Sequence, residues 1–325
     1  MSEPAGQDFL ASVPLFAGRT AAELDELVAL MRPRTVQPGR TLWHQGDEPR
    51  ELILIVDGTV SASVRVTGGR EVEIGTSGRG EIVGLIGVLD GAGHATTVRA
   101  VDATTVLALG SLDFAALLAG MTPSAFRLRR HLARLLAARL GSQIEHLAAS
   151  LGGGAPGPVA RPDAEPLAPE LDPAPAADSR YVRRMASFHD FDPLALWGFL
   201  TSGRYVHCPP GRTLLEEGAP SPAYYLTING AVEKVLVRGD RRIRVGLAGP
   251  GKAFGYEGLI DGRASQVTAI ARERALLLVV PRELFGRLFA GEDAVSRGFL
   301  AVIQNDLMAT LRETLRPAAR LAAIS

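Results

Sequence analysis

The pattern of apolar and polar positions divides the chain into helical and β regions that alternate twice. Residues 9–31 carry apolar side chains at helical spacing, at Leu24, Leu27, Val28 and Met31. This spacing predicts short helices before the first β region.

Between residues 38 and 109 the apolar runs become short and are separated by Gly, Asp and Pro. Short strands at regular spacing, with turn residues between them, are typical of an all-β barrel or sandwich. The pairs Asp57-Gly58 and Gly68-Gly69 are typical of hairpin turns.

Residues 122–151 return to helical spacing, with Thr122 or Ser124 as the N-cap and Gly152 as the end. Five arginines and one glutamate lie on the remaining faces. We interpret this helix as a dimer or domain-docking seam with a solvated basic face; a nucleic-acid or membrane surface is the alternative. Its apolar stripe consists of Leu132, Leu136, Leu140, Ile144, Leu147 and Leu151.

The second half of the chain repeats the first about 172 residues later. Residues 38–42, Pro-Gly-Arg-Thr-Leu, recur as residues 210–214. Helical residues 180–203 precede strands from about 206 to 280, and a final helix follows, which Pro317 is expected to disrupt. The apolar face of this helix consists of Phe299, Ile303, Leu307, Leu311 and Leu315. A repeat this long is a whole domain.

A segment rich in Gly, Pro and Ala, residues 152–178, connects the two halves. Such a composition buries too little apolar surface to fold, which predicts a disordered linker. We therefore expect a domain over 9–151, a linker over 152–178 and a second domain over 179–316.

The overall composition excludes several classes of protein. The formal net charge of the 325 residues is +0, so there is no general attraction to nucleic acid or to an anionic membrane. Cys208 is the only cysteine, and the six histidines lack zinc-ligand spacing, so we expect no metal site and no catalytic residues. No export signal or membrane-spanning stretch is recognisable, and we expect a cytoplasmic protein.

The chain resembles the cyclic-nucleotide-binding domain of the catabolite-activator and protein-kinase-A regulatory-subunit lineage (Crp/Fnr-like). The resemblance is carried by short motifs in the family's order in each half. They are Val13-Pro14-Leu15-Phe16, Pro38-Gly39, Gly46-Asp47, Gly58, Gly84 and Val98-Arg99-Ala100, then Pro210-Gly211, Gly218, Gly230, Phe254-Gly255, Arg263 and Val267-Thr268-Ala269. The resemblance implies a mainly β fold with flanking α: two β-roll domains (jelly-roll-like, double-stranded β-helix), each with N-terminal helices and a C-terminal helix.

In that family the ligand lies in a phosphate-binding cassette, in which a glutamate holds the ribose hydroxyl and an arginine and a Thr or Ser hold the phosphate. In the first domain Leu85 stands at the glutamate position, His94 at the arginine position and Thr97 at the hydroxyl position. A largely neutral imidazole cannot replace a guanidinium. We interpret this cassette as retained for packing; the alternative is an altered pocket formed by Gly84, Leu85, His94, Ala95 and Thr97.

The second cassette has the expected residue types on a shorter frame. Glu257 lies one place late, Arg263 stands at the arginine position, and only seven residues separate Gly255 from Arg263, against nine in the first domain. Glu257 and Arg263 are expected to hold a ribose hydroxyl and a phosphate; alternatively they pair with each other. The candidate ligand-binding residues are Phe254, Gly255, Tyr256, Glu257, Gly258, Arg263, Ala264 and Ser265.

The resemblance implies a non-catalytic regulatory protein that senses a cyclic nucleotide, cyclic AMP or cyclic GMP, through its second domain and relays binding through the C-terminal helices. A protein partner and a homodimer through those helices are expected, and no cofactor. Direct DNA binding is disfavoured, because no helix-turn-helix pattern follows the final helix. The alternatives are a ligand-free scaffold and a transcription regulator that acts through a partner.

Overall fold

The computed structural model describes residues 6–66, 69–149, 171–189, 191–238 and 241–322. The chain divides into two compact units, residues 1–135 with 315–325, and residues 136–314. Each unit contains one β-roll built from two antiparallel sheets. The two-domain β-roll architecture expected from the sequence is therefore confirmed.

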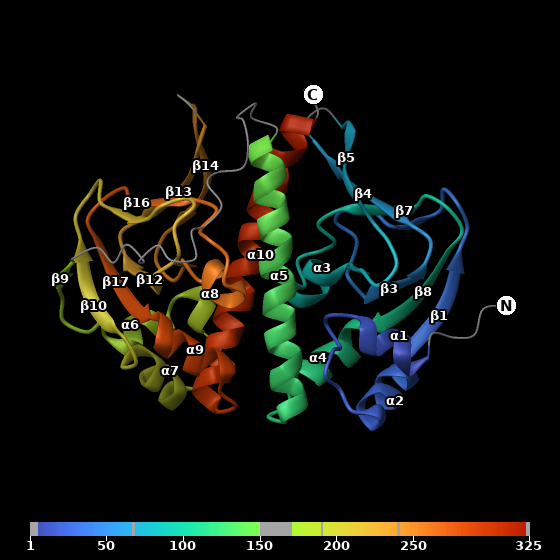
Figure 1. Ribbon diagram of the computed structural model, residues 1–325, viewed down its shortest axis with the longest axis horizontal. Helices are drawn as coiled ribbons and strands as arrows, with labels where there is room; N and C mark the ends of the chain where they lie inside the picture. The colour runs from blue at the N-terminus through green and yellow to red at the C-terminus, as the bar shows by residue number, and fades with distance from the viewer. Residues whose placement is uncertain (1–5, 67–68, 150–170, 190, 239–240, 323–325) are drawn as a thin grey trace. The chain divides into compact units, whose positions relative to one another are not determined.

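In the first unit, helices gather at one end of the roll (Figure 1). These are α1 (Gln7–Ser12), α2 (Ala21–Leu30) and α4 (Ser111–Ala119). One sheet has the order β1 (Met31–Val36), β8 (Thr104–Gly110), β3 (Glu51–Asp57), β6 (Ile82–Val83). The other has the order β2 (Thr41–Trp43), β7 (Thr97–Ala100), β4 (Val60–Arg65), β5 (Glu71–Ser77). The short helix α3 (Leu85–Asp90) follows β6, and the long helix α5 (Pro123–Ala149) follows α4.

The helix boundaries follow from local capping. Thr20 and Glu23 form a capping box, in which each side chain accepts a hydrogen bond from the other's backbone N–H, and α2 therefore begins at Ala21. At α5 the Thr122 hydroxyl accepts from the Ala125 N–H at 3.2 Å, so Thr122 rather than Ser124 is the cap. The predicted end at Gly152 lies outside the described residues.

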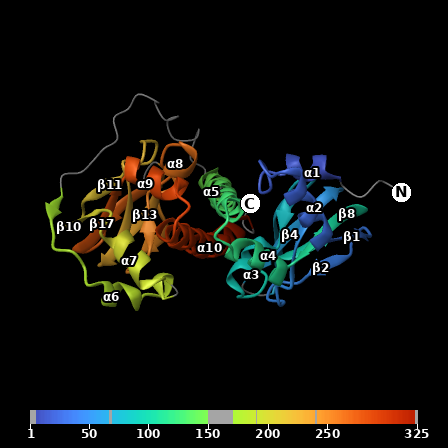
Figure 2. The ribbon, with the colours of Figure 1, turned by 90° about the horizontal axis from the view of Figure 1, so that it is seen from below.

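The second unit repeats the two sheets and adds one strand. The first sheet has the order β15 (Ala253–Phe254), β12 (Ala223–Asn229), β17 (Ala275–Pro281), β10 (Arg204–Cys208), β9 (Asp172–Pro173). The second has the order β11 (Thr213–Leu215), β16 (Thr268–Ala271), β13 (Val232–Arg238), β14 (Arg241–Ala248). Seen from below in Figure 2, α6 (Ser179–Arg183), α7 (Pro193–Leu200) and α9 (Arg282–Ala290) lie at the near end of this roll. The remaining helices are the 3-10 turn η1 (Ala186–Phe188), α8 (Glu257–Asp261) and α10 (Ala294–Ala322).

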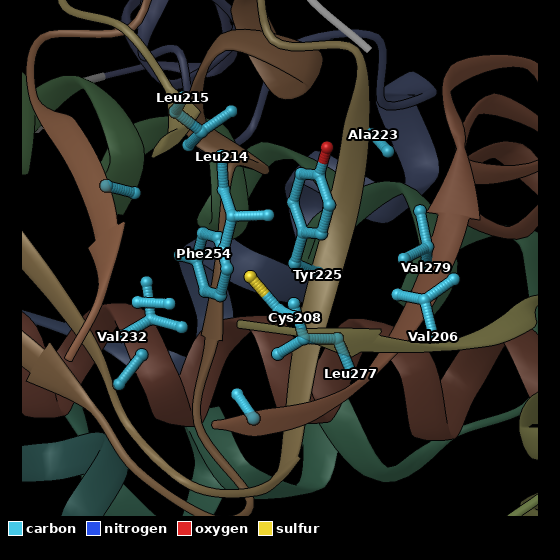
Figure 3. Close-up of a cluster of buried hydrophobic side chains, with 14 residues drawn as sticks. Val206, Cys208, Leu214, Leu215, Ala223, Tyr225, Val232, Phe254, Leu277 and Val279 are labelled. Atoms are coloured by element: carbon cyan, nitrogen blue, oxygen red, sulfur yellow. The ribbon is translucent and has the colours of Figure 1, made fainter. Parts of the chain in front are cut away.

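Buried apolar side chains form a cluster in the second roll, as Figure 3 shows. Tyr225 and Phe254 stack with ring centroids 4.9 Å apart and an interplanar angle of 6°, next to Cys208 and Leu214. Burial raises the pKa of Cys208 to about 11 and that of Tyr225 to about 12, so both remain protonated at neutral pH. This cluster is an apolar core.

Helix α10 is held to the second roll by aromatic packing. Phe299 contacts the rings of Phe199, Tyr224 and Phe285 at centroid distances of 5.6, 5.3 and 5.4 Å. Gly298 provides the room, because a Cβ there would lie 2.1 Å from the Phe191 ring. Of the expected apolar face, Phe299, Ile303, Leu307 and Leu311 are buried, and Leu315 is half-buried.

Several local expectations were wrong. Met31 begins β1 instead of ending α2, since Pro33 restricts the preceding residue to extended backbone. Asp57-Gly58 connects two different sheets and is not a hairpin turn, whereas β4 and β5 do form a hairpin that includes Gly69. Gly68 lies outside the described residues.

Two longer segments also differ from expectation. Asp172–Pro173 form β9 beside β10, and Leu171 packs against the core, so the end of the expected linker belongs to the second fold. Residues 152–170 of that linker lie outside the described residues. Helix α10 continues through Pro317 to Ala322, because a proline removes only one backbone donor and a long helix tolerates that loss.

Candidate functional site

Both cassettes place a short helix after a glycine in the left-handed region. Gly84 has φ 84° before the six residues of α3, and Gly255 has φ 81° before the five residues of α8. Both helices end at left-handed glycines, Gly91 and Gly262. The shortened spacing of the second cassette thus corresponds to a shorter helix and turn on the same frame.

The first cassette is packed with its own side chains. His94 is 4% exposed and stacks on Trp43, with ring centroids 4.1 Å apart and an interplanar angle of 10°. Leu85 is fully buried, and the Thr97 hydroxyl accepts a hydrogen bond from the Gln45 N–H at 3.0 Å. The side chains at three of the ligand positions therefore make contacts within the domain itself. Gly84 and Ala95 are partly exposed beside them.

The second cassette instead presents a charged side chain to solvent. Arg263 is 44% exposed, and its guanidinium contacts the Asp261 carboxylate at 2.6 Å. Its Nη1 atom lies 4.0 Å from Glu145 Oε1, in the part of α5 that belongs to the second unit. Gln266 donates to the same Glu145 oxygen at 2.8 Å. Arg263 is thus paired with Asp261, and the alternative that it pairs with Glu257 is not what the structure shows.

Tyr256 connects the cassette to α10. Its buried hydroxyl donates to Asp306 Oδ2 at 2.5 Å, and the Ala253 N–H donates to Asp306 Oδ1 at 3.4 Å. Lys252 Nζ lies 4.0 Å from the same carboxylate. Burial and the nearby Asp306 charge raise the pKa of Tyr256 well above 10, so its hydroxyl remains a donor.

Glu257 is the first residue of α8, and it is half-buried. Burial raises its pKa from the ordinary value of 4.5, while the positive charge of Lys234 acts in the opposite direction. Lys234, on β13, is 5% exposed. None of the sequence motifs pointed to this lysine.

The remaining candidate residues of the second cassette have structural contacts. Phe254 lies in the stacked core, and a Cβ at Gly258 would lie 2.4 Å from the Arg263 carbonyl oxygen. Ala264 forms a β-bridge with Pro220, and the Ser265 hydroxyl donates to the Val267 carbonyl at 2.8 Å. The charged side chains of this cassette are those of Glu257, Asp261 and Arg263, and Lys234 acts on Glu257 from β13.

The family model of the cyclic nucleotide-binding domain matches this chain twice, at residues 33–120 and 205–292. A curated relative, the cyclic AMP receptor protein of Thermus thermophilus, is 32% identical over 123 residues, which are 38% of this chain and 57% of the relative. The chain therefore spans little more than half of that relative's length.

Two solved structures are also similar. The N-terminal domain of a transcriptional regulator from Streptomyces coelicolor is 32% identical, with a TM-score of 0.36, over 40% of this chain and 92% of that one. The regulatory domain of Toxoplasma gondii PKA with cAMP is 17% identical, with a TM-score of 0.35, over 86% of this chain and 89% of that one. None of the helices in the described part of the chain combines the length and apolar character needed to cross a membrane.

Proposed function

Because this chain belongs to the cyclic nucleotide-binding domain family, we propose that it is a non-catalytic regulatory protein that senses a cyclic nucleotide or related phosphate ligand through its second domain. We choose the second domain over the first because of one observation. At the arginine position of the cassette, the second domain has Arg263 with 44% of its side chain exposed, whereas the first has His94, stacked on Trp43.

When the ligand binds, its phosphate replaces the Asp261 carboxylate as the partner of the Arg263 guanidinium. An ion pair between partly exposed side chains contributes little stability, so this exchange costs little. A phosphate offers a guanidinium two charge-assisted hydrogen bonds. The Glu257 carboxylate accepts a hydrogen bond from a ribose hydroxyl, and cyclic AMP and cyclic GMP are the first ligands to test.

Binding is relayed through α10. The cassette residue Tyr256 is hydrogen-bonded to Asp306, so a ligand that moves α8 also acts on the helix. If α10 has two positions, the ligand shifts the equilibrium between them by the difference between its binding free energies for the two. For the first domain we favour a packing or interaction role, since Trp43 and His94 occupy its cassette.

We also infer a cytoplasmic protein with a protein partner. A homodimer through the C-terminal helices stays a prediction for light scattering to test. Phe299 and Leu307 of α10 are already buried by the chain itself, so such a dimer would have to use another face of the helix.

Calorimetric titration of the full chain with cyclic AMP, cyclic GMP and cyclic dinucleotides tests the proposal. Wild type should bind one of them, and Arg263→Ala should weaken binding at least tenfold through loss of a charge-assisted contact. The matched control is Arg272→Ala, which removes an exposed arginine paired with Glu233 on the same roll. Absence of binding to wild type, or equal binding by Arg263→Ala, would contradict the proposal.

A further inference from the structure

The chain has 35 lysines and arginines, and only two of them, Lys234 and Lys252, are lysines. Both lie near the second cassette. Lys252 Nζ is 4.0 Å from Asp306, and Lys234 interacts electrostatically with Glu257. Of these two, Lys234 is the one that is almost fully buried.

Lys234 extends into the β-roll. On β13 it pairs with Ala269 of β16 and with Gly246 of β14. Val232, two residues earlier on the same face, and Ala269 belong to the apolar interior of the roll. Lys234 is 5% exposed, so its stem lies among these residues.

Gly246 makes room for the lysine. A Cβ at this position would lie 3.1 Å from Lys234 Cε and 3.8 Å from Nζ. The same point is 3.9 Å from Oε2 of Glu313 on α10. The ammonium group therefore lies toward the side of the roll where α10 and its carboxylate approach.

The lysine and the glutamate are a coordinated difference between the two repeats. Ala62 of β4 pairs with Val98 and Gly75, as Lys234 pairs with Ala269 and Gly246, so Ala62 is its counterpart. The counterpart of Glu257, two residues after the left-handed glycine, is Ile86. The first domain has apolar residues at both positions, and the second has opposite charges.

A buried pair of opposite charges is costly to the fold, and apolar residues at both positions, as in the first domain, would be at least as stable. An anion that entered the roll would offset that cost. An ammonium is also a common point-charge ligand for phosphate oxygens.

We propose that Lys234 is an anion-binding residue of the second domain, whose ammonium binds a phosphate oxygen of the ligand from inside the roll while Glu257 accepts a hydroxyl. The ligand class is a nucleotide with a free sugar hydroxyl. The inference rests on the proposed function and adds a contact to it, because Arg263 acts from the exposed side of the cassette.

The test is calorimetry on the full chain with Lys234→Met, using the nucleotide that wild type binds. We expect affinity to fall about 10- to 100-fold, as for loss of a charge-assisted hydrogen bond. Arg272→Met, at an exposed arginine outside the cassette, is the control and should bind as wild type does. Lys234→Met alone leaves Glu257 without its opposite charge and is expected to lower the unfolding temperature, so thermal unfolding must show that the variant is folded at the titration temperature. The double variant Lys234→Met/Glu257→Gln, which removes both charges, should unfold at the wild-type temperature or higher.

A second measurement observes the lysine directly. Lysine carrying 13C at Cε gives two side-chain signals in this chain, assigned with the Lys234→Met variant. The Lys234 signal should shift on titration, with the calorimetric midpoint. Equal affinity of Lys234→Met and wild type, or an unmoved signal at saturation, would overturn the inference while leaving the Arg263 site in place. If wild type binds no nucleotide, the proposed function and this inference both fail.

Discussion

The two domains place different side chains on nearly the same cassette backbone. After the left-handed glycine the first domain has Leu85 and the second has Tyr256, which is hydrogen-bonded to α10. Inside the roll, Ala62 of the first domain corresponds to Lys234 of the second. The first cassette is closed by an indole–imidazole stack, and the second retains a charged arginine at its surface.

The difference teaches that the family backbone alone does not specify a binding site. Glycines fix the turns in both copies, because no other residue adopts these φ values without strain. Ligand chemistry depends on a few side chains between those turns. These can be exchanged for apolar residues without loss of the fold, as the first domain shows.

The largest expected effect comes from emptying the first cassette. Trp43→Ala should destabilise the first domain by about 3–5 kcal/mol, as for other large-to-small substitutions in a core. Chemical denaturation, monitored by hydrogen exchange in the first domain, measures the loss of unfolding free energy. Trp197→Ala, at the second tryptophan, which is 58% exposed on α7, should cost less than about 0.5 kcal/mol. Similar losses for both variants would show that the indole does not fill the site.

The next effect compares the two cassette glycines. A Cβ at Gly255 would lie 2.7 Å from the Ala223 carbonyl oxygen, whereas at Gly84 the nearest atom is in the Trp43 ring, 3.1 Å away. Gly255→Ala should therefore cost about 3 kcal/mol, combining backbone strain and overpacking, and Gly84→Ala should cost less. Denaturation midpoints of the two variants give the comparison, and the reverse order would contradict it.

The contact that distinguishes the second cassette is tested by Tyr256→Phe. This change leaves the buried Asp306 without its shortest hydrogen bond and should cost about 2 kcal/mol. Tyr224→Phe is a close control, since the buried Tyr224 hydroxyl has no hydrogen-bond partner among the residues that the structure describes. This change should be neutral or stabilising. Thermal unfolding measures both, and an equal response would remove the basis for the α10 relay.

The smallest effect is a dependence on pH. Because the pKa of Glu257 is raised in the folded chain, the protonated form is favoured there, and stability falls as pH rises from 4.5 through the folded pKa. Glu257→Gln should therefore be more stable than wild type near pH 8 and equal to it near pH 4. Glu283→Gln, on the exposed side of α9, is the control. The measurement is the unfolding free energy between pH 4 and pH 8. A difference between wild type and Glu257→Gln that is the same at every pH would show that the pKa of Glu257 is not raised in the folded chain.

The sequence by itself determined the repeated fold, because glycine turns and short apolar runs leave signals that do not depend on distant residues. Gly84, Gly255 and the strands around them lie where the pattern predicted. It also showed that His94 and Arg263 occupy equivalent positions.

Only the tertiary structure decided what those side chains contact. That Trp43 stacks on His94, that Arg263 lies near Glu145, and that Lys234 enters the roll depend on strand register and on segments far apart in the chain. The same holds for β9, which forms because the edge of β10 is available to a segment of disorder-like composition. The composition of a segment does not show which distant segment it will contact, because that contact forms only when the chain folds.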